Sequence, residues 1–95
     1  MASLVAMVRT GDEIDEAVRR VVDLAGGIDV KPGEIVLVKP NMSCAKPSGS
    51  GLVTSVEVVA SLVRLVKEMG AKPLVGDLPI VGWDPEETYR VIGIR

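Results

Sequence analysis

The sequence feature that most constrains this chain is an alternation of short apolar runs with longer segments whose apolar residues recur every three or four positions. Short continuous runs are typical of strands covered on both faces, whereas the wider spacing is that of one helix face. The expected elements are strands at 3–9, 34–39 and 72–77 and helices at 14–25, 54–69 and 84–93. The order β-α-β-α-β-α predicts a small parallel sheet with right-handed crossovers, in a Rossmann-like three-layer α/β fold.

The predicted helix ends carry recognisable signals. Glycines at 26–27 are expected to stop the first helix. Thr54 followed by Glu57 makes a capping-box pattern at the start of the second helix. Asp84 followed by Pro85 predicts the start of the third, with Asp as N-cap and Pro at the first helical position.

Length and composition limit the classes of protein to which the chain can belong. Its 95 residues suit one small domain, and its apolar runs are far shorter than the roughly 18 residues needed to cross a bilayer. The N-terminus lacks the pattern of a secretory signal and the chain has a single cysteine, so we expect a cytoplasmic protein with no membrane partner. The scarcity of Asn and Gln is a bias typical of thermophile proteins.

Charge and side-chain chemistry exclude further classes of binding and catalytic site. A net charge of −2 opposes nucleic-acid binding, and an aromatic content of 2% leaves few rings for base stacking. The absence of His removes the commonest general base and metal ligand. A His-based catalytic triad and a His-containing zinc site are therefore excluded within these residues.

The predicted sheet needs more cover than these residues easily provide. Parallel sheets normally have both faces covered, and three helices barely achieve this for three strands. We therefore expect residues 1–95 to form a single α/β domain that is either the N-terminal part of a larger domain or extends its sheet by self-association. Pro73, at the start of the third strand, indicates an edge strand.

The carboxyl ends of the predicted strands are the expected place for a ligand, because open α/β sheets bind ligands there. Lys39 and Asn41 follow the second strand, and Asp77 ends the third. The N-terminus of the second helix adds backbone N–H groups, and the glycines of the preceding loop allow close approach. The candidate ligand-binding residues are Lys39, Asn41, Gly49, Ser50, Gly51, Thr54 and Asp77. Together they predict a site for an anionic small molecule, a phosphate or a carboxylate.

Each of these residues also has a purely structural interpretation. Lys39 could be solvated, Asn41 could form an Asx turn and Thr54 could only cap its helix. Asp77 could orient Lys39, bind a metal or act as a base, or it could be a turn or N-cap residue. No catalytic residue is assigned, and the sequence leaves open whether the protein is an enzyme.

The loop before the second helix lacks two common nucleotide motifs and contains the chain's single thiol. Residues 49–56 lack the third glycine of a dinucleotide fingerprint and the Gly-Lys-Ser/Thr of a P-loop. Cys44 lies near Lys39 and Lys46, which can lower a thiol pKa, but the chain has no His to activate it. A free, silent thiol is the simpler interpretation of Cys44.

Several segments resemble one known family in the same order along the chain. They are 36–41 (Val-Leu-Val-Lys-Pro-Asn), 49–54 (Gly-Ser-Gly-x-x-Thr), 58–59, 67–71, 75–79 (Val-Gly-Asp-Leu-Pro) and 89–94. Together they resemble the family catalogued as domain of unknown function 362, over nearly the whole chain. Ser55-Val56 replaces the usual Asp- or His-Pro pair, and Leu78 replaces a common Ser, so no role is carried over to these positions.

The resemblance implies a longer protein and a possible redox partner. Family members are typically longer, and many carry a ferredoxin-like module whose clustered cysteines hold [4Fe–4S] centres. The expectation is thus no cofactor within this chain, with an iron–sulfur cluster in a downstream module. Besides the anion-binding crevice, two functions remain open: a non-catalytic scaffold that docks such a module, and a self-associating interaction module.

Overall fold

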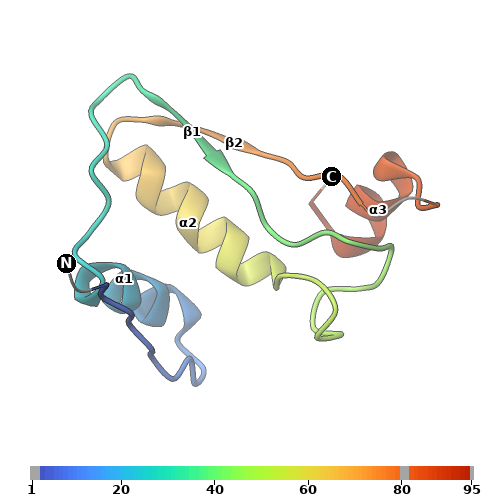
Figure 1. The fold of residues 1–95 in the computed structure, drawn as a ribbon, viewed down its shortest axis with the longest axis horizontal. Helices are drawn as coiled ribbons and strands as arrows, with labels where there is room; N and C mark the ends of the chain where they lie inside the picture. Colours follow the sequence, from blue (N-terminus) through green and yellow to red (C-terminus); the bar gives the residue numbers. More distant parts are fainter. Residues whose placement is uncertain (1–2, 80–81, 95) are drawn as a thin grey trace.

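The computed structural model describes residues 3–79 and 82–94 (Figure 1). In chain order its elements are α1 (Ile14–Leu24), β1 (Ile35–Val38), α2 (Val56–Glu68), β2 (Lys72–Val75) and α3 (Pro85–Ile92). The strands pair in parallel, with Ile35 opposite Lys72 and Val38 opposite Val75. A mixed α/β chain with a small parallel sheet is therefore confirmed for the described residues.

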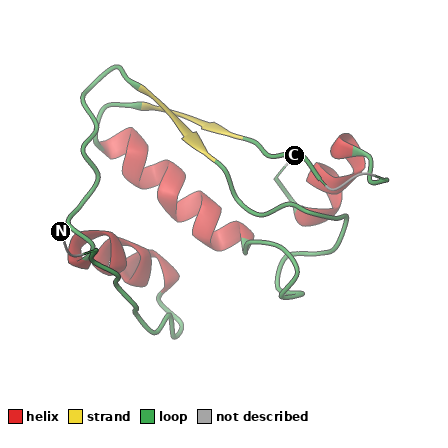
Figure 2. Ribbon diagram, in the orientation of Figure 1, coloured by secondary structure: helices red, strands yellow, loops and turns green. Residues whose placement is uncertain are grey.

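Helix α2 is the centre of this arrangement. It contacts both strands on one side and α1 on the other, while α3 lies beyond the carboxyl ends of the strands (Figure 2). Val59 and Val66 of α2 are only 4% and 2% exposed, and Ala17 and Val18 are the buried residues of α1. Aliphatic burial on two sides of α2 thus joins the sheet to α1.

The strand expected at residues 3–9 does not form. These residues run over the surface without strand pairing, and Leu4, Val5 and Met7 are 68%, 82% and 90% exposed. A run of β-favouring side chains gives a local preference, but a strand also needs a neighbour that takes its backbone hydrogen bonds. The described residues consequently form two strands with helix on one face, rather than the expected three-stranded, three-layer arrangement.

The two edges of the sheet differ. Lys72 N donates to Glu34 O at 2.7 Å and Gly76 N donates to Val38 O at 3.2 Å, so alternate residues of β2 face β1. Pro73 falls between them, and its missing N–H lies on the outer edge of β2. The prediction that Pro73 marks an edge strand is confirmed. By the same alternation, Ile35 and Leu37 direct their N–H groups to the outer edge of β1, which has no proline.

Two of the three predicted helix ends are confirmed. Gly26 and Gly27 adopt φ values of 104° and 81°, in the left-handed region that ends α1. The Asp84 side chain accepts a hydrogen bond from Glu87 N at 3.1 Å, with Pro85 as the first residue of α3.

The predicted capping box at α2 is wrong. The N-cap residue is Ser55, and Thr54 Oγ1 accepts instead from the backbone N–H of Asn41 at 2.8 Å. Ser55 Oγ donates to the carboxylate of Glu57 at 2.5 Å. The Thr54 hydroxyl bonds to the preceding loop and not to the helix, and a local sequence pattern does not reveal this longer-range partner.

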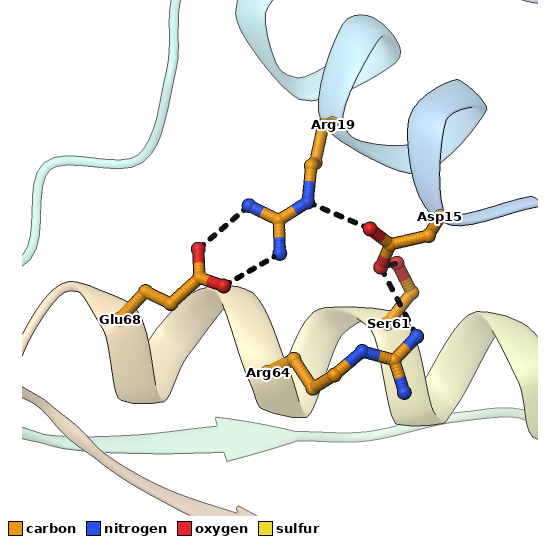
Figure 3. Close-up of polar contacts among 5 residues, drawn as sticks. All are labelled: Asp15, Arg19, Ser61, Arg64 and Glu68. Atoms are coloured by element: carbon orange, nitrogen blue, oxygen red, sulfur yellow. Dashed lines mark hydrogen bonds and ion pairs between the residues drawn. The ribbon is translucent and has the colours of Figure 1, made fainter.

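A polar network joins α1 to α2 (Figure 3). Asp15 accepts hydrogen bonds from Ser61 Oγ at 2.6 Å and from the Arg64 guanidinium at 3.1 Å. Arg19 donates to Asp15 at 2.9 Å and binds both carboxylate oxygens of Glu68 at 2.7 and 2.9 Å. The bonds from Ser61, Arg19 and Arg64 hold the pKa of Asp15 well below its usual range, and Arg19 lowers the pKa of Glu68.

Acid should weaken this network. Folding lowers the pKa of Asp15, so the stability that it contributes is present above roughly pH 4 and is lost as the pH falls further. We expect Asp15→Asn to lower the melting temperature at neutral pH, and this difference from the wild type to shrink below about pH 4 in thermal melts. Asp29→Asn, at an exposed loop position, is the charge-matched control and should melt like the wild type. A difference that stays constant down to about pH 2 would contradict the prediction.

Candidate functional site

A crevice lies where the two parallel strands end. Val38 closes β1 and is followed by Lys39, while β2 is followed by Gly76 and Asp77. Because parallel strands bring their carboxyl ends to one edge, these residues meet there. The cavity between them measures about 450 Å³ and is lined by Leu37, Lys39, Gly76, Asp77, Leu78 and Tyr89. This is the position that the strand pattern predicted for a ligand.

The crevice contains an ion pair that crosses the sheet. Lys39 Nζ lies 3.1 Å from Asp77 Oδ1, and the two side chains are 68% and 14% exposed. The other carboxylate oxygen of Asp77 accepts from Met42 N at 3.3 Å. Asp77 thereby fixes Lys39 on one side, while most of the Lys39 side chain still faces solvent.

Asp77 is held in its charged form. Burial favours the neutral acid, but hydrogen bonds from Lys39 and from the backbone N–H groups of Met42 and Leu78 outweigh burial and leave the pKa of Asp77 below its ordinary value. An ionised carboxylate that already accepts several hydrogen bonds is a poor proton acceptor. The geometry therefore favours the positioning of Lys39 by Asp77 over a general-base role for Asp77.

Asn41 and Thr54 close the loop between β1 and α2. Asn41 N donates to Thr54 Oγ1 at 2.8 Å, and Thr54 N donates back to Asn41 O at 2.9 Å. The Asn41 side chain accepts from Ser43 N at 3.2 Å, which is an Asx turn, and donates to Leu52 O at 3.5 Å. Both polar groups of the Asn41 side chain are thus engaged inside the loop.

Gly49, Ser50 and Gly51 form the exposed tip of this loop, away from the residues that line the crevice. The two glycines have φ values of 91° and 85°, which other residues rarely adopt. Ser50 Oγ accepts from Leu52 N at 3.2 Å. Among the seven predicted ligand-binding residues, the structure brings Lys39 and Asp77 together in the crevice. Thr54 lies with Lys39 in the lining of a separate groove between β1 and α2, and the other four lie in the loop.

The start of α2 is engaged by neighbouring side chains. Val56 N donates to Ser48 Oγ at 2.9 Å, and the carboxylate of Glu57 lies against its own backbone N–H and the Ser55 hydroxyl. These hydrogen bonds, with that from Ser55 the strongest, lower the pKa of Glu57. An acidic side chain therefore already occupies the positive end of the α2 dipole.

Tyr89 of α3 is a crevice residue that sequence reasoning placed in a helix without a role. Its hydroxyl donates to the backbone carbonyl of Asp77 at 2.6 Å, so α3 is tied to the end of β2. The signal that could have revealed it is rarity, because Tyr89 is the single tyrosine of a chain with almost no aromatic residues.

The described residues do not form a metal or cluster site. No group of three or more His, Cys, Asp or Glu side chains in them could hold a metal ion. Cys44 is a free thiol packed against the buried cluster of Met42, Val53 and Ile92. One cysteine does not fit a [4Fe–4S] cluster, which takes four, so the iron–sulfur expectation concerns another module and stays a prediction.

The fold and the site define an α/β domain in which a cation, Lys39, and a carboxylate, Asp77, lie together at the edge where the two parallel strands end. The family model described as domain of unknown function (DUF362) matches residues 36–95, more than half of the chain. The chain belongs to this family, which confirms the resemblance in its sequence.

One curated relative is a thylakoid-associated protein, sll1697, of Synechocystis sp., to which the chain is 41% identical over 68 residues. That match covers 70% of this chain and 21% of the relative, so the chain spans about a fifth of the relative's length. No solved structure gives a significant match. In the part of the chain that the structure describes, no helix is long and apolar enough to span a bilayer. The cytoplasmic location stays a prediction.

The reciprocal bonds between Asn41 and Thr54 can be tested by amide hydrogen exchange. Thr54→Val removes the oxygen that accepts from Asn41 N while it keeps the branched shape. Loss of one such bond costs about 1 kcal/mol, so the Asn41 amide should exchange roughly fivefold faster. Ser50→Ala, which removes an acceptor at the loop tip, should leave the Asn41 rate unchanged. Unaltered exchange at Asn41 in Thr54→Val would show that the loop is closed by other contacts.

Proposed function

We propose that this protein binds an anionic small molecule, a phosphate or a carboxylate, in the crevice at the carboxyl ends of β1 and β2. The observation that carries the proposal is the Lys39 side chain, which is 68% exposed and yet held at 3.1 Å by Asp77. An ammonium group has three donors, and the ion pair leaves donors free for a ligand. Open α/β sheets bind ligands in the crevice outside the carboxyl ends of their strands, and Lys39 lies in that crevice here.

The surrounding residues support this role. Asp77 takes its orientation from Met42 N and in turn orients Lys39, so the cation is positioned before a ligand arrives. Asn41 and Thr54 support the site indirectly, because they hold closed the loop that follows Lys39. Preorganisation of this kind lowers the entropy cost of binding.

The proposal is tested by titration of the labelled protein with sodium phosphate and sodium acetate in NMR spectra. We expect weak binding of at least one of these anions, with shifts at the amides of Gly76 and Leu78, which line the crevice. Lys39→Ala should abolish these shifts, and Lys39→Arg should retain them. Lys67→Ala, an exposed lysine on α2, is the matched control and should titrate like the wild type. Equal shifts in Lys39→Ala and the wild type would refute the crevice as the anion site.

The unequal edges of the sheet favour a second function, association between two copies. We propose that β1 of one copy pairs with β1 of another across a two-fold axis and so extends the sheet. Pro73 blocks the outer edge of β2, whereas Ile35 and Leu37 direct their N–H groups to the outer edge of β1. A groove of about 370 Å³ between β1 and α2 lies beside Leu37 and Val38. The exposed Ile35, Leu37 and Leu74 side chains also show that the described residues do not cover the sheet face opposite α2.

Sedimentation velocity of edge variants tests this association. Ile35→Pro removes one outward N–H of β1 without removing a bond to β2, so we expect it to convert a dimer into a monomer. Ile35→Val keeps the N–H and should remain dimeric. A monomeric wild type, or a dimer that persists in Ile35→Pro, would exclude pairing through this edge.

A further inference from the structure

The crevice combines one cation with an apolar wall. Apart from Lys39 and Asp77, it is lined by Leu37, Leu78, Gly76 and the ring of Tyr89. Leu37 and Leu78 are 61% and 76% exposed, so their aliphatic surface is open to a ligand at the mouth of the cavity. Leu74, opposite Leu37 in the register, is 56% exposed and continues this apolar surface along the sheet. A ligand that binds Lys39 therefore also contacts the aliphatic side chains beside it.

The charge of the site suits a single negative charge. Among the described residues that line the crevice, Lys39 is the one cation, and it is paired with Asp77 at 3.1 Å. A phosphate dianion would need further donors, and the Asp77 carboxylate would repel its two charges about twice as strongly as the single charge of a monocarboxylate. The usual source of such donors, a helix N-terminus, is engaged here, because Val56 N is bonded to Ser48 Oγ and Glu57 occupies the start of α2.

From these two observations we propose that the ligand is a monocarboxylate with an apolar body, such as a medium-length aliphatic or arylalkyl acid. The inference rests on the proposed anion-binding function and narrows its ligand class. The carboxylate accepts the free donors of Lys39, and the hydrocarbon lies along Leu37 and Leu78 towards the ring of Tyr89. Most of the ligand's affinity then comes from the burial of apolar surface, and Lys39 fixes its orientation.

The test compares four anions of graded chemistry by NMR titration of the same protein: acetate, hexanoate, 3-phenylpropionate and inorganic phosphate. Each buried methylene tightens binding by roughly fourfold, so hexanoate should bind at least about tenfold more tightly than acetate. Phosphate should bind no more tightly than acetate. Hexanamide, which has the same hydrocarbon chain without the charge, should bind more weakly than hexanoate.

Two variants separate the contributions of charge and hydrocarbon. Lys39→Ala should abolish the advantage of hexanoate over hexanamide. Leu78→Ala, at a side chain too exposed to matter for folding, should weaken the binding of hexanoate several-fold and leave the binding of acetate unchanged. Leu24→Ala on α1, also an exposed position, is the control for non-specific apolar binding and should change the affinity for neither hexanoate nor acetate.

The outcomes distinguish failure of this inference from failure of the proposed function. Lys39-dependent binding of phosphate that is tighter than that of hexanoate would overturn the monocarboxylate and leave the anion site standing. Hexanoate binding that Lys39→Ala does not alter would overturn both, as would the absence of binding by all four anions.

Discussion

The candidate site depends on one carboxylate, that of Asp77. One oxygen pairs with Lys39, which follows β1, and the other accepts from Met42 N in the loop. Its backbone carbonyl accepts from Tyr89 of α3. A single residue at the end of β2 therefore joins three other segments. Because Asp77 is 14% exposed and ionised, its desolvation is compensated only while these donors remain in place.

Helix α2 imposes the second constraint. One side of α2 packs under the sheet, and the side towards α1 adds polar contacts to aliphatic burial, among them the bond from the buried Ser61 hydroxyl to the Asp15 carboxylate. The sheet and α1 thus both pack on α2. On the opposite face of the sheet, Ile35 and Leu37 are exposed. Among the described residues, α2 covers one face of the sheet and apolar side chains stay exposed on the other, and this asymmetry is the basis for proposing both hydrocarbon binding and sheet extension.

Sequence reasoning succeeded where the signal is local. The apolar runs and helical spacing located β1, β2 and all three helices, and Asp84 and Pro73 fulfilled their predicted roles because each acts through its own backbone geometry. It failed where a partner had to be known. Residues 3–9 have the composition of a strand, but a strand is defined by its pairing, and Thr54 has the pattern of a cap but bonds to Asn41 thirteen residues earlier.

The same distinction explains which residues of the candidate site could be predicted from the sequence. Lys39 and Asp77 could be predicted to meet, because the parallel order of two strands fixes where both strands end. The rarity of Tyr89 could single it out, but its place in the crevice could not be predicted, since a helix sequence does not say where that helix docks. Its position has a chemical consequence for the ligand. With its hydroxyl bonded to the Asp77 carbonyl, Tyr89 brings an aromatic ring, rather than a further cation, to the crevice. The docking of α3 therefore places an aromatic ring in this wall of the crevice, and that ring is one reason for proposing a ligand that carries hydrocarbon as well as charge.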